Sequence, residues 1–166
     1  MKQCRNNAGF TLMEVIGVLV IIGFLAVIAI PGRSSTSLFG LSSNADVIRN
    51  HLFYAQSLAM KQGSVGGIKC DGMQYWLFKA NAPDDAANQL PLPGEDAVKI
   101  SLSNKKITLT AFTLFFDFAG RPYTAYADSI VNAPVDAGNQ LVITVGVPSD
   151  PATKTITITP ETGFIQ

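Results

Sequence analysis

The sequence predicts an α+β protein in which a long N-terminal α-helix packs against a C-terminal antiparallel β-sheet domain. Three observations lead to this prediction. Residues 10–31 form an apolar run that is long enough to enter a bilayer. Residues 32–63 continue with apolar side chains at helical spacing, and residues 64–166 contain short β-prone segments separated by turn signals. We therefore expect a helix with a membrane half and an amphipathic half, followed by a β-rich globular domain.

The composition restricts the classes of partner. The chain has 166 residues with 12 basic and 12 acidic side chains, so its formal net charge is zero. A nucleic-acid-binding protein usually has a basic excess on one face, whereas the basic residues here are scattered along the chain. This balance argues against a nucleic acid as a partner. The length is sufficient for one domain with a hydrophobic core.

The apolar run of residues 10–31 has two general interpretations. A helix from Phe10 to Ile30 would rise by about 30 Å, which matches the hydrocarbon core of a bilayer. A secretory signal peptide would have a shorter apolar core and a small-residue cleavage site after it. A simple signal anchor explains the run except for Glu14, because a carboxylate costs about 2.5–3.5 kcal/mol near the bilayer centre. A capping box, with Thr11 at the N-cap and Glu14 three residues later, is a local explanation for that carboxylate.

The segment after the apolar run begins with residues that disfavour a helix. Pro31 is expected to interrupt the helical hydrogen bonds and to kink the chain. Gly32 and Gly40 lower the helix propensity further, so this segment is either a linker or a weak, bent part of one long helix. Beyond it, helical spacing predicts a buried face that ends before Gly63. That face comprises Leu41, Ala45, Ile48, Leu52, Ala55 and Ala59, and is widened by Val47, Tyr54 and Leu58.

Strand signals follow Gly63. The pair Asp71-Gly72 lies between two β-prone runs and predicts a hairpin, with Trp76 as a core anchor. The segments AVKISL, KITLT and FTLFFDFAG have strand character, and QLVITVGV with KTITITP predicts a second hairpin. Residues 80–96 and 123–138 are rich in Ala, Asp, Asn and Pro, and we expect them to be irregular.

The chain carries few residues suited to catalysis or metal binding. His51 is the only histidine, so a Ser-His-Asp or Cys-His set would have to use it, and its helical surroundings favour a solvated or packed side chain. Cys4 and Cys70 form no CxxC pair, and Cys70 is expected to be a small buried hydrophobe. The adjacent Asp84 and Asp85 lack the spacing of a calcium loop. Without a P-loop, GxGxxG or HExxH motif, we expect no enzyme activity, no metal and no cofactor.

The segment GFTLMEV, residues 9–15, resembles the cleavage motif of type IV prepilins and type II secretion pseudopilins. It combines a short basic leader that ends in Gly, a Gly-Phe junction and a Glu five residues after the Gly. The resemblance implies that residues 1–9 are a leader, that prepilin peptidase cuts between Gly9 and Phe10, and that the new amine of Phe10 is N-methylated. It also implies that Glu14 meets the Phe10 amine of a neighbouring subunit during assembly.

The same resemblance carries expectations about architecture, partners and location. It implies the pilin fold, with one long N-terminal helix curved near Pro31. The implied partners are prepilin peptidase, other pilin or pseudopilin subunits, an inner-membrane assembly platform and the lipid of the inner membrane. The implied location is the bacterial inner membrane, with a single span and a periplasmic C-terminal domain, and later the filament.

Shorter motifs later in the chain refine the resemblance. FDFAGRP, ITITPETGFIQ and YAQSLAMKQG are similar to segments of the H-type minor pseudopilins and the FimT-like minor pilins. They imply a structural minor subunit of a type IV pilus or a type II secretion pseudopilus. A major pilin is one alternative, although many major pilins have a disulfide and cleavage would leave Cys70 alone. The other is a signal-anchored periplasmic binding domain that never polymerises.

Overall fold

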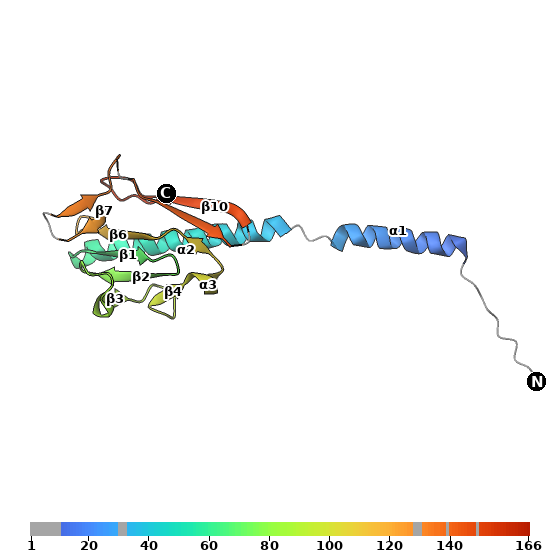
Figure 1. The fold of residues 1–166 in the computed structure, drawn as a ribbon, viewed down its shortest axis with the longest axis horizontal. Helices are drawn as coiled ribbons and strands as arrows, with labels where there is room; N and C mark the ends of the chain where they lie inside the picture. Colours follow the sequence, from blue (N-terminus) through green and yellow to red (C-terminus); the bar gives the residue numbers. More distant parts are fainter. Residues whose placement is uncertain (1–10, 30–32, 128–130, 139, 149) are drawn as a thin grey trace, which may run out of the picture. The chain divides into compact units, whose positions relative to one another are not determined.

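The structure is a computed structural model that describes residues 11–29, 33–127, 131–138, 140–148 and 150–166. The chain forms two compact units, Met1–Ser35 and Thr36–Gln166. The predicted fold class is confirmed, because two N-terminal helices precede antiparallel strands (Figure 1).

Helix α1, Leu12–Ala29, is almost wholly apolar, and its side chains from Leu12 to Leu25 are exposed. Within the described part of the chain, no helix combines the length and apolar character needed to cross a membrane.

Helix α2, Arg33–Gln62, passes through Gly40, so the segment from Arg33 onward is helical and not a linker. Helix α2 ends in a Schellman motif, in which Ser64 N–H donates to the Ala59 carbonyl and Gly63 N–H donates to the Met60 carbonyl. Gly63 adopts a φ of 60°, as this motif requires. The predicted stop at Gly63 is therefore confirmed.

The predicted buried face of α2 is confirmed, with exposed fractions between 0% and 5% for its six residues. The prediction that Val47 and Tyr54 widen this buried face is wrong, because their side chains are 37% and 39% exposed. The sheets cover only the stripe that contains Ile48 and Leu52, and both outliers lie at its border. Leu58 is half-buried against the same core.

The larger sheet has seven strands in the order β3-β2-β1-β6-β7-β8, with β4 also paired to β2. All of its pairings are antiparallel. Its strands are β1 (Gly66–Cys70), β2 (Gln74–Lys79), β3 (Gln89–Leu90), β4 (Lys99–Ser101), β6 (Phe112–Phe116), β7 (Pro122–Tyr126) and β8 (Asn132–Pro134).

The β1–β2 hairpin confirms the prediction made from Asp71-Gly72. The Asp71 carboxylate accepts hydrogen bonds from the Met73 and Gln74 amides at 2.8 and 2.7 Å, and Gly72 adopts a φ of +92°. Both features stabilise a tight turn.

The two segments expected to be irregular are not wholly so. Residues 80–96 contain a short helix, η1 (Ala86–Asn88), and strand β3, and residues 123–138 contain β8 and all of β7 except Pro122. These strands are held extended by pairing, because β3 pairs with β2, β7 with β6, and β8 with β7.

The smaller sheet has the order β10-β9-β5, with β5 (Thr108–Leu109), β9 (Val142–Val147) and β10 (Asp150–Thr157). Strands β9 and β10 form the second predicted hairpin, with an irregularity between Asp150 and Thr153. A short helix, α3 (Leu102–Lys105), precedes β5, and Ile165 pairs with Ile158 beyond the end of β10.

The main core lies between α2 and both sheets, as the buried Leu52, Leu114 and Ile143 illustrate. Figure 1 shows α2 running beside β1 and β10. A second cluster forms on the other face of the larger sheet around Trp76, Phe78 and Phe115. Trp76 is 3% exposed, which confirms its predicted role as a core anchor.

Candidate functional site: the N-terminal segment and the α2 junction

The first turn of α1 is capped by Thr11. Its carbonyl accepts hydrogen bonds from the amides of Glu14 and Val15, and its side-chain oxygen accepts from the Glu14 amide at 3.3 Å. This contact is the first half of the predicted capping box. Glu14 is exposed, and its negative charge at the helix N-terminus is favoured by the helix dipole.

Three of the predicted site residues, Gly9, Phe10 and Pro31, lie outside the described residues. Cleavage, N-methylation and the helix kink at these positions therefore remain predictions. The contact between Glu14 and a neighbouring subunit is also a prediction.

Residues 4–30 match the family model described as the prokaryotic N-terminal methylation motif. This segment carries the type IV pilin and pseudopilin signature. The motif supports a type IV pilin-like substrate of prepilin peptidase. No curated protein and no solved structure matches the chain.

The three later segments that carried a resemblance in the sequence meet at one place in the globular unit, which we call the α2 junction. It consists of Gln56, the turn containing Gly120 and the C-terminal turn containing Thr162 and Gly163. The Gln56 side-chain amide lies 2.9 Å from the Gly120 carbonyl oxygen and 3.2 Å from those of Thr162 and Gly163. One helical side chain thus joins two turns that are more than forty residues apart in sequence.

Two glycines with positive φ lie at the α2 junction. A Cβ on Gly120 would lie 2.9 Å from the Met60 sulfur, and one on Gly163 would lie 2.7 Å from the Gly120 carbonyl oxygen. Both contacts are closer than real Cβ atoms accept. Gly163 is therefore required by packing against the backbone as well as by its own conformation, whereas at Gly120 the flexible Met60 side chain can shift and the positive φ is what requires a glycine.

Asp117 shapes the turn that contributes Gly120. One carboxylate oxygen accepts from the amides of Ala119 and Arg121 at 2.8 and 2.9 Å, and the other accepts from the Tyr123 hydroxyl at 3.1 Å. Burial, followed by the nearby Asp117 charge, raises the pKa of Tyr123. The sequence analysis did not assign Gln56 or Asp117 a role, although each lies inside a segment that carried the family resemblance.

His51 lies on α2 and is buried against the loop that contains Pro93. Its Nε2 lies 3.2 Å from the Pro93 carbonyl oxygen, which can only accept, so Nε2 carries the proton. Its Nδ1 lies 3.2 Å from the Tyr75 hydroxyl and, in the neutral ring, accepts from it. His51 is 4% exposed. Of the two expected states, solvated or packed, the structure shows the packed one.

We expect the stability of the chain to fall as His51 is protonated. Burial lowers the pKa of His51 below its usual 6.5, while the Glu95 charge opposes this shift and the Lys105 charge adds to it. The unfolded chain therefore binds the proton first, so the stabilisation is complete above about pH 6.5 and is lost as the pH falls toward the lower folded pKa. A His51→Gln variant should remove this dependence, which amounts to at most about 1.4 kcal/mol per pH unit.

Urea unfolding of both proteins between pH 5 and 8 measures the difference. Most carboxylates titrate below this window, so they contribute little to the comparison. Parallel pH profiles for the wild type and the variant would contradict the prediction.

Cys70 is 2% exposed in β1, which confirms the prediction of a small buried residue. The Gly72 amide donates to its sulfur at 3.4 Å. Burial raises the pKa of the thiol, so Cys70 remains protonated and unreactive near neutral pH. Within the described residues, no group of three or more His, Cys, Asp or Glu side chains is arranged to hold a metal ion.

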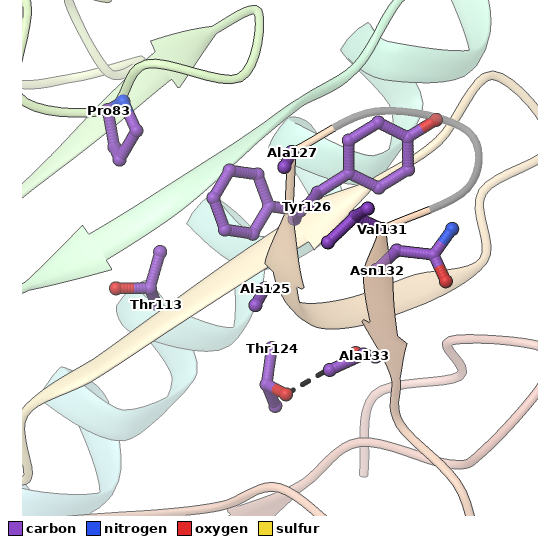
Figure 2. A pocket seen from close by; sticks show the side chains of 10 residues that line it. Pro83, Thr113, Thr124, Ala125, Tyr126, Ala127, Val131, Asn132 and Ala133 are labelled. Atoms are coloured by element: carbon purple, nitrogen blue, oxygen red, sulfur yellow. Dashed lines mark hydrogen bonds between the residues drawn. The ribbon is translucent and has the colours of Figure 1, made fainter.

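A hollow of about 500 Å³ lies on the larger sheet, between the β7–β8 hairpin and the loop after β2 (Figure 2). Phe115 is among the residues that line it, and Figure 2 shows Tyr126 on one side and Pro83 across from it. The sequence analysis missed this hollow, because it is assembled from β6, β7, β8 and a loop that was expected to be irregular.

Proposed function

We propose that the chain is a structural minor pilin or minor pseudopilin that prepilin peptidase processes before assembly into a type IV pilus or a type II secretion pseudopilus. The observation that carries this proposal is the methylation motif at residues 4–30, followed by α1 and an α+β globular unit. The α2 junction supports the H-type or FimT-like version, because it joins the three short segments that resemble those proteins.

The proposal divides the chain into four parts. Residues 1–9 are the leader, residues 10–31 the membrane and polymerisation helix with a kink at Pro31, residues 32–63 its amphipathic continuation, and residues 64–166 the periplasmic domain. The precursor resides in the inner membrane, in contact with lipid and the assembly platform, and then enters the filament.

Glu14 acts in this proposal as a registry device. Cleavage after Gly9 creates a cation at Phe10, and Glu14 of one subunit pairs with that amine on its neighbour. Such a pair is favourable chiefly against leaving either charge alone in an apolar bundle, so it favours one axial offset between subunits. The exposure of Glu14 in the first turn of α1 is compatible with this contact.

Replacement of Glu14 separates the registry role from helix capping. Glu14→Ala should leave cleavage and membrane insertion intact and reduce incorporation into filaments. Glu14→Gln should reduce it similarly, because a glutamine retains the capping-box geometry and lacks the charge. Thr11→Ala, the matched control, removes the cap and keeps the charge, so it should assemble. Normal incorporation of Glu14→Gln, measured by quantifying the subunit in sheared filaments, would refute the registry role.

The intact mass of the membrane-extracted protein tests the proposed function itself. We expect a chain that begins at Phe10 and carries one additional methyl group. A chain that begins at Met1 would contradict the pilin assignment and favour the signal-anchored domain. Abundance then separates the remaining alternative, because a major pilin would dominate sheared filaments.

A further inference from the structure

A second cavity, of about 490 Å³, lies in the globular unit and is lined by α2 on one side and by Pro93, Glu95 and Lys105 on the other. We call it the α2 cleft. The lining side chains of α2 recur every three or four residues from Asn44 to Tyr54, so they share one face of the helix. The volume lies within the range of ordinary ligand pockets.

The turn that faces α2 across this cleft is fixed by the backbone. The Glu95 amide donates to the Leu92 carbonyl at 3.2 Å, and Gly94 adopts a φ of 78°, as in a type II turn with Pro93 at its second position. The His51 ring donates from Nε2 to the Pro93 carbonyl at 3.2 Å and attaches the turn to α2. The cleft is therefore preorganised, which lowers the entropic cost of binding.

Several polar groups that line the α2 cleft are not used by the protein. Within the described residues, the side chains of Asn44, Asn50 and Tyr54 make no hydrogen bond. The Glu95 side chain is 12% exposed, and its Oε1 accepts from Lys105 at 2.7 Å. Its Oε2 has no partner among the described residues, so a largely buried carboxylate oxygen is available to a ligand.

The charges of the lining favour a neutral ligand. Glu95 and Lys105, the two ionised side chains in the described lining, already neutralise each other. The remaining polar groups include both donors and acceptors, which suits hydroxyl groups because each hydroxyl can donate and accept. Val47 and Tyr54 add apolar surface in the same lining, against which the C–H face of a sugar ring can pack.

We propose that the α2 cleft binds a neutral saccharide through Asn44, Asn50 and the Oε2 of Glu95, with a ring face packed on Tyr54. The inference concerns the globular unit alone and does not rest on the proposed function. A free amino acid is disfavoured, because its two charged groups would have to compete with the Glu95–Lys105 ion pair. An apolar ligand is disfavoured, because it would cover the free carboxylate oxygen without bonding to it.

Ligand-detected saturation-transfer NMR tests for binding. The full chain, in a detergent without a sugar headgroup, is titrated with maltose, lactose and N-acetyl-D-glucosamine. We expect saturable transfer to at least one of these sugars and none to L-serine, a zwitterion that also carries a hydroxyl. Absence of transfer to all three sugars would overturn the proposal, and a response to L-serine alone would replace the saccharide with a zwitterionic ligand.

Two pairs of variants place the sugar in the α2 cleft. Asn50→Ala removes one neutral hydrogen bond and should weaken binding about fivefold, whereas Gln62→Ala, which removes an exposed amide of α2 outside the lining, should not. Glu95→Gln removes the charge of the acceptor and should weaken binding about tenfold. Asp96→Asn makes the same change at the exposed neighbouring residue and should retain the wild-type affinity.

Trp76 emission confirms that each variant is folded before its affinity is compared. Wild-type affinity in both Asn50→Ala and Glu95→Gln would show that the sugar binds elsewhere and would overturn the assignment. Since binding is measured on the isolated chain, a negative result leaves the proposed function intact, and a chain that fails to enter filaments can still bind the sugar.

Discussion

Gly67→Ala is expected to destabilise the folded chain by about 3 kcal/mol or more. Gly67 lies in β1, between β2 and β6, and a Cβ built on it overlaps with the Leu114 carbonyl oxygen. The same Cβ would lie 2.8 Å from the Leu114 carbonyl carbon and 3.0 Å from the Phe115 Cα. All of these atoms are backbone, so the clash can be relieved only by separating two central strands. Urea unfolding followed by Trp76 emission measures the loss.

Gly138→Ala is the matched control for this substitution. A Cβ on Gly138 would meet only the Asp136 carboxylate, at an ordinary contact distance of 3.5 Å. Its stability should therefore remain within about 0.5 kcal/mol of the wild type, as for most surface substitutions. Equal stabilities of the two alanine variants would show that β1 and β6 accommodate a side chain at Gly67.

Gln56→Met is expected to cost about 2 kcal/mol, because it removes the amide whose two N–H groups are shared among three carbonyls of the α2 junction while nearly preserving volume. The carbonyls of Gly120 and Gly163 are then left partly buried without this donor. We also expect faster amide exchange in the C-terminal turn, because its attachment to α2 is weakened. Hydrogen exchange monitored by mass spectrometry provides that measurement.

Gln62→Met provides the comparison, since Gln62 is an exposed residue in the last turn of the same helix. It makes the same chemical change on the surface and should alter stability by less than about 0.5 kcal/mol. If Gln56→Met and Gln62→Met were equally stable, the hydrogen bonds of Gln56 would contribute nothing net.

The sequence pattern correctly predicted those helices and turns that are determined by residues close together in the chain. The apolar spacing from Leu41 to Ala59 identified the buried face of α2, and Asp71-Gly72 identified the first hairpin. Strands β7 and β8 were missed because their pairing depends on distant partners: β7 pairs with β6, and β8 pairs with β7. Val47 and Tyr54 were misassigned because periodicity does not determine how wide a stripe the sheets cover.

The same distinction applies to the candidate site. The methylation motif is a continuous segment, so the sequence alone pointed to Gly9, Phe10 and Glu14. The α2 junction and the hollow beside Phe115 combine residues from distant segments, and no spacing rule connects them. The junction left one trace in the sequence, since its three parts lie in the short segments that resembled minor pilins and pseudopilins.

The contacts of α2 with the C-terminal segment have a mechanical consequence. Arg49 donates to the Ile165 carbonyl, and Gln56 holds the turn at Gly163, so two points roughly 10 Å apart along the helix secure the last residues. A pull along α2 would load these two attachments one after the other. The C-terminal residues therefore resist a pulling force. Both attachments must break before this segment separates from α2 and the force reaches β10.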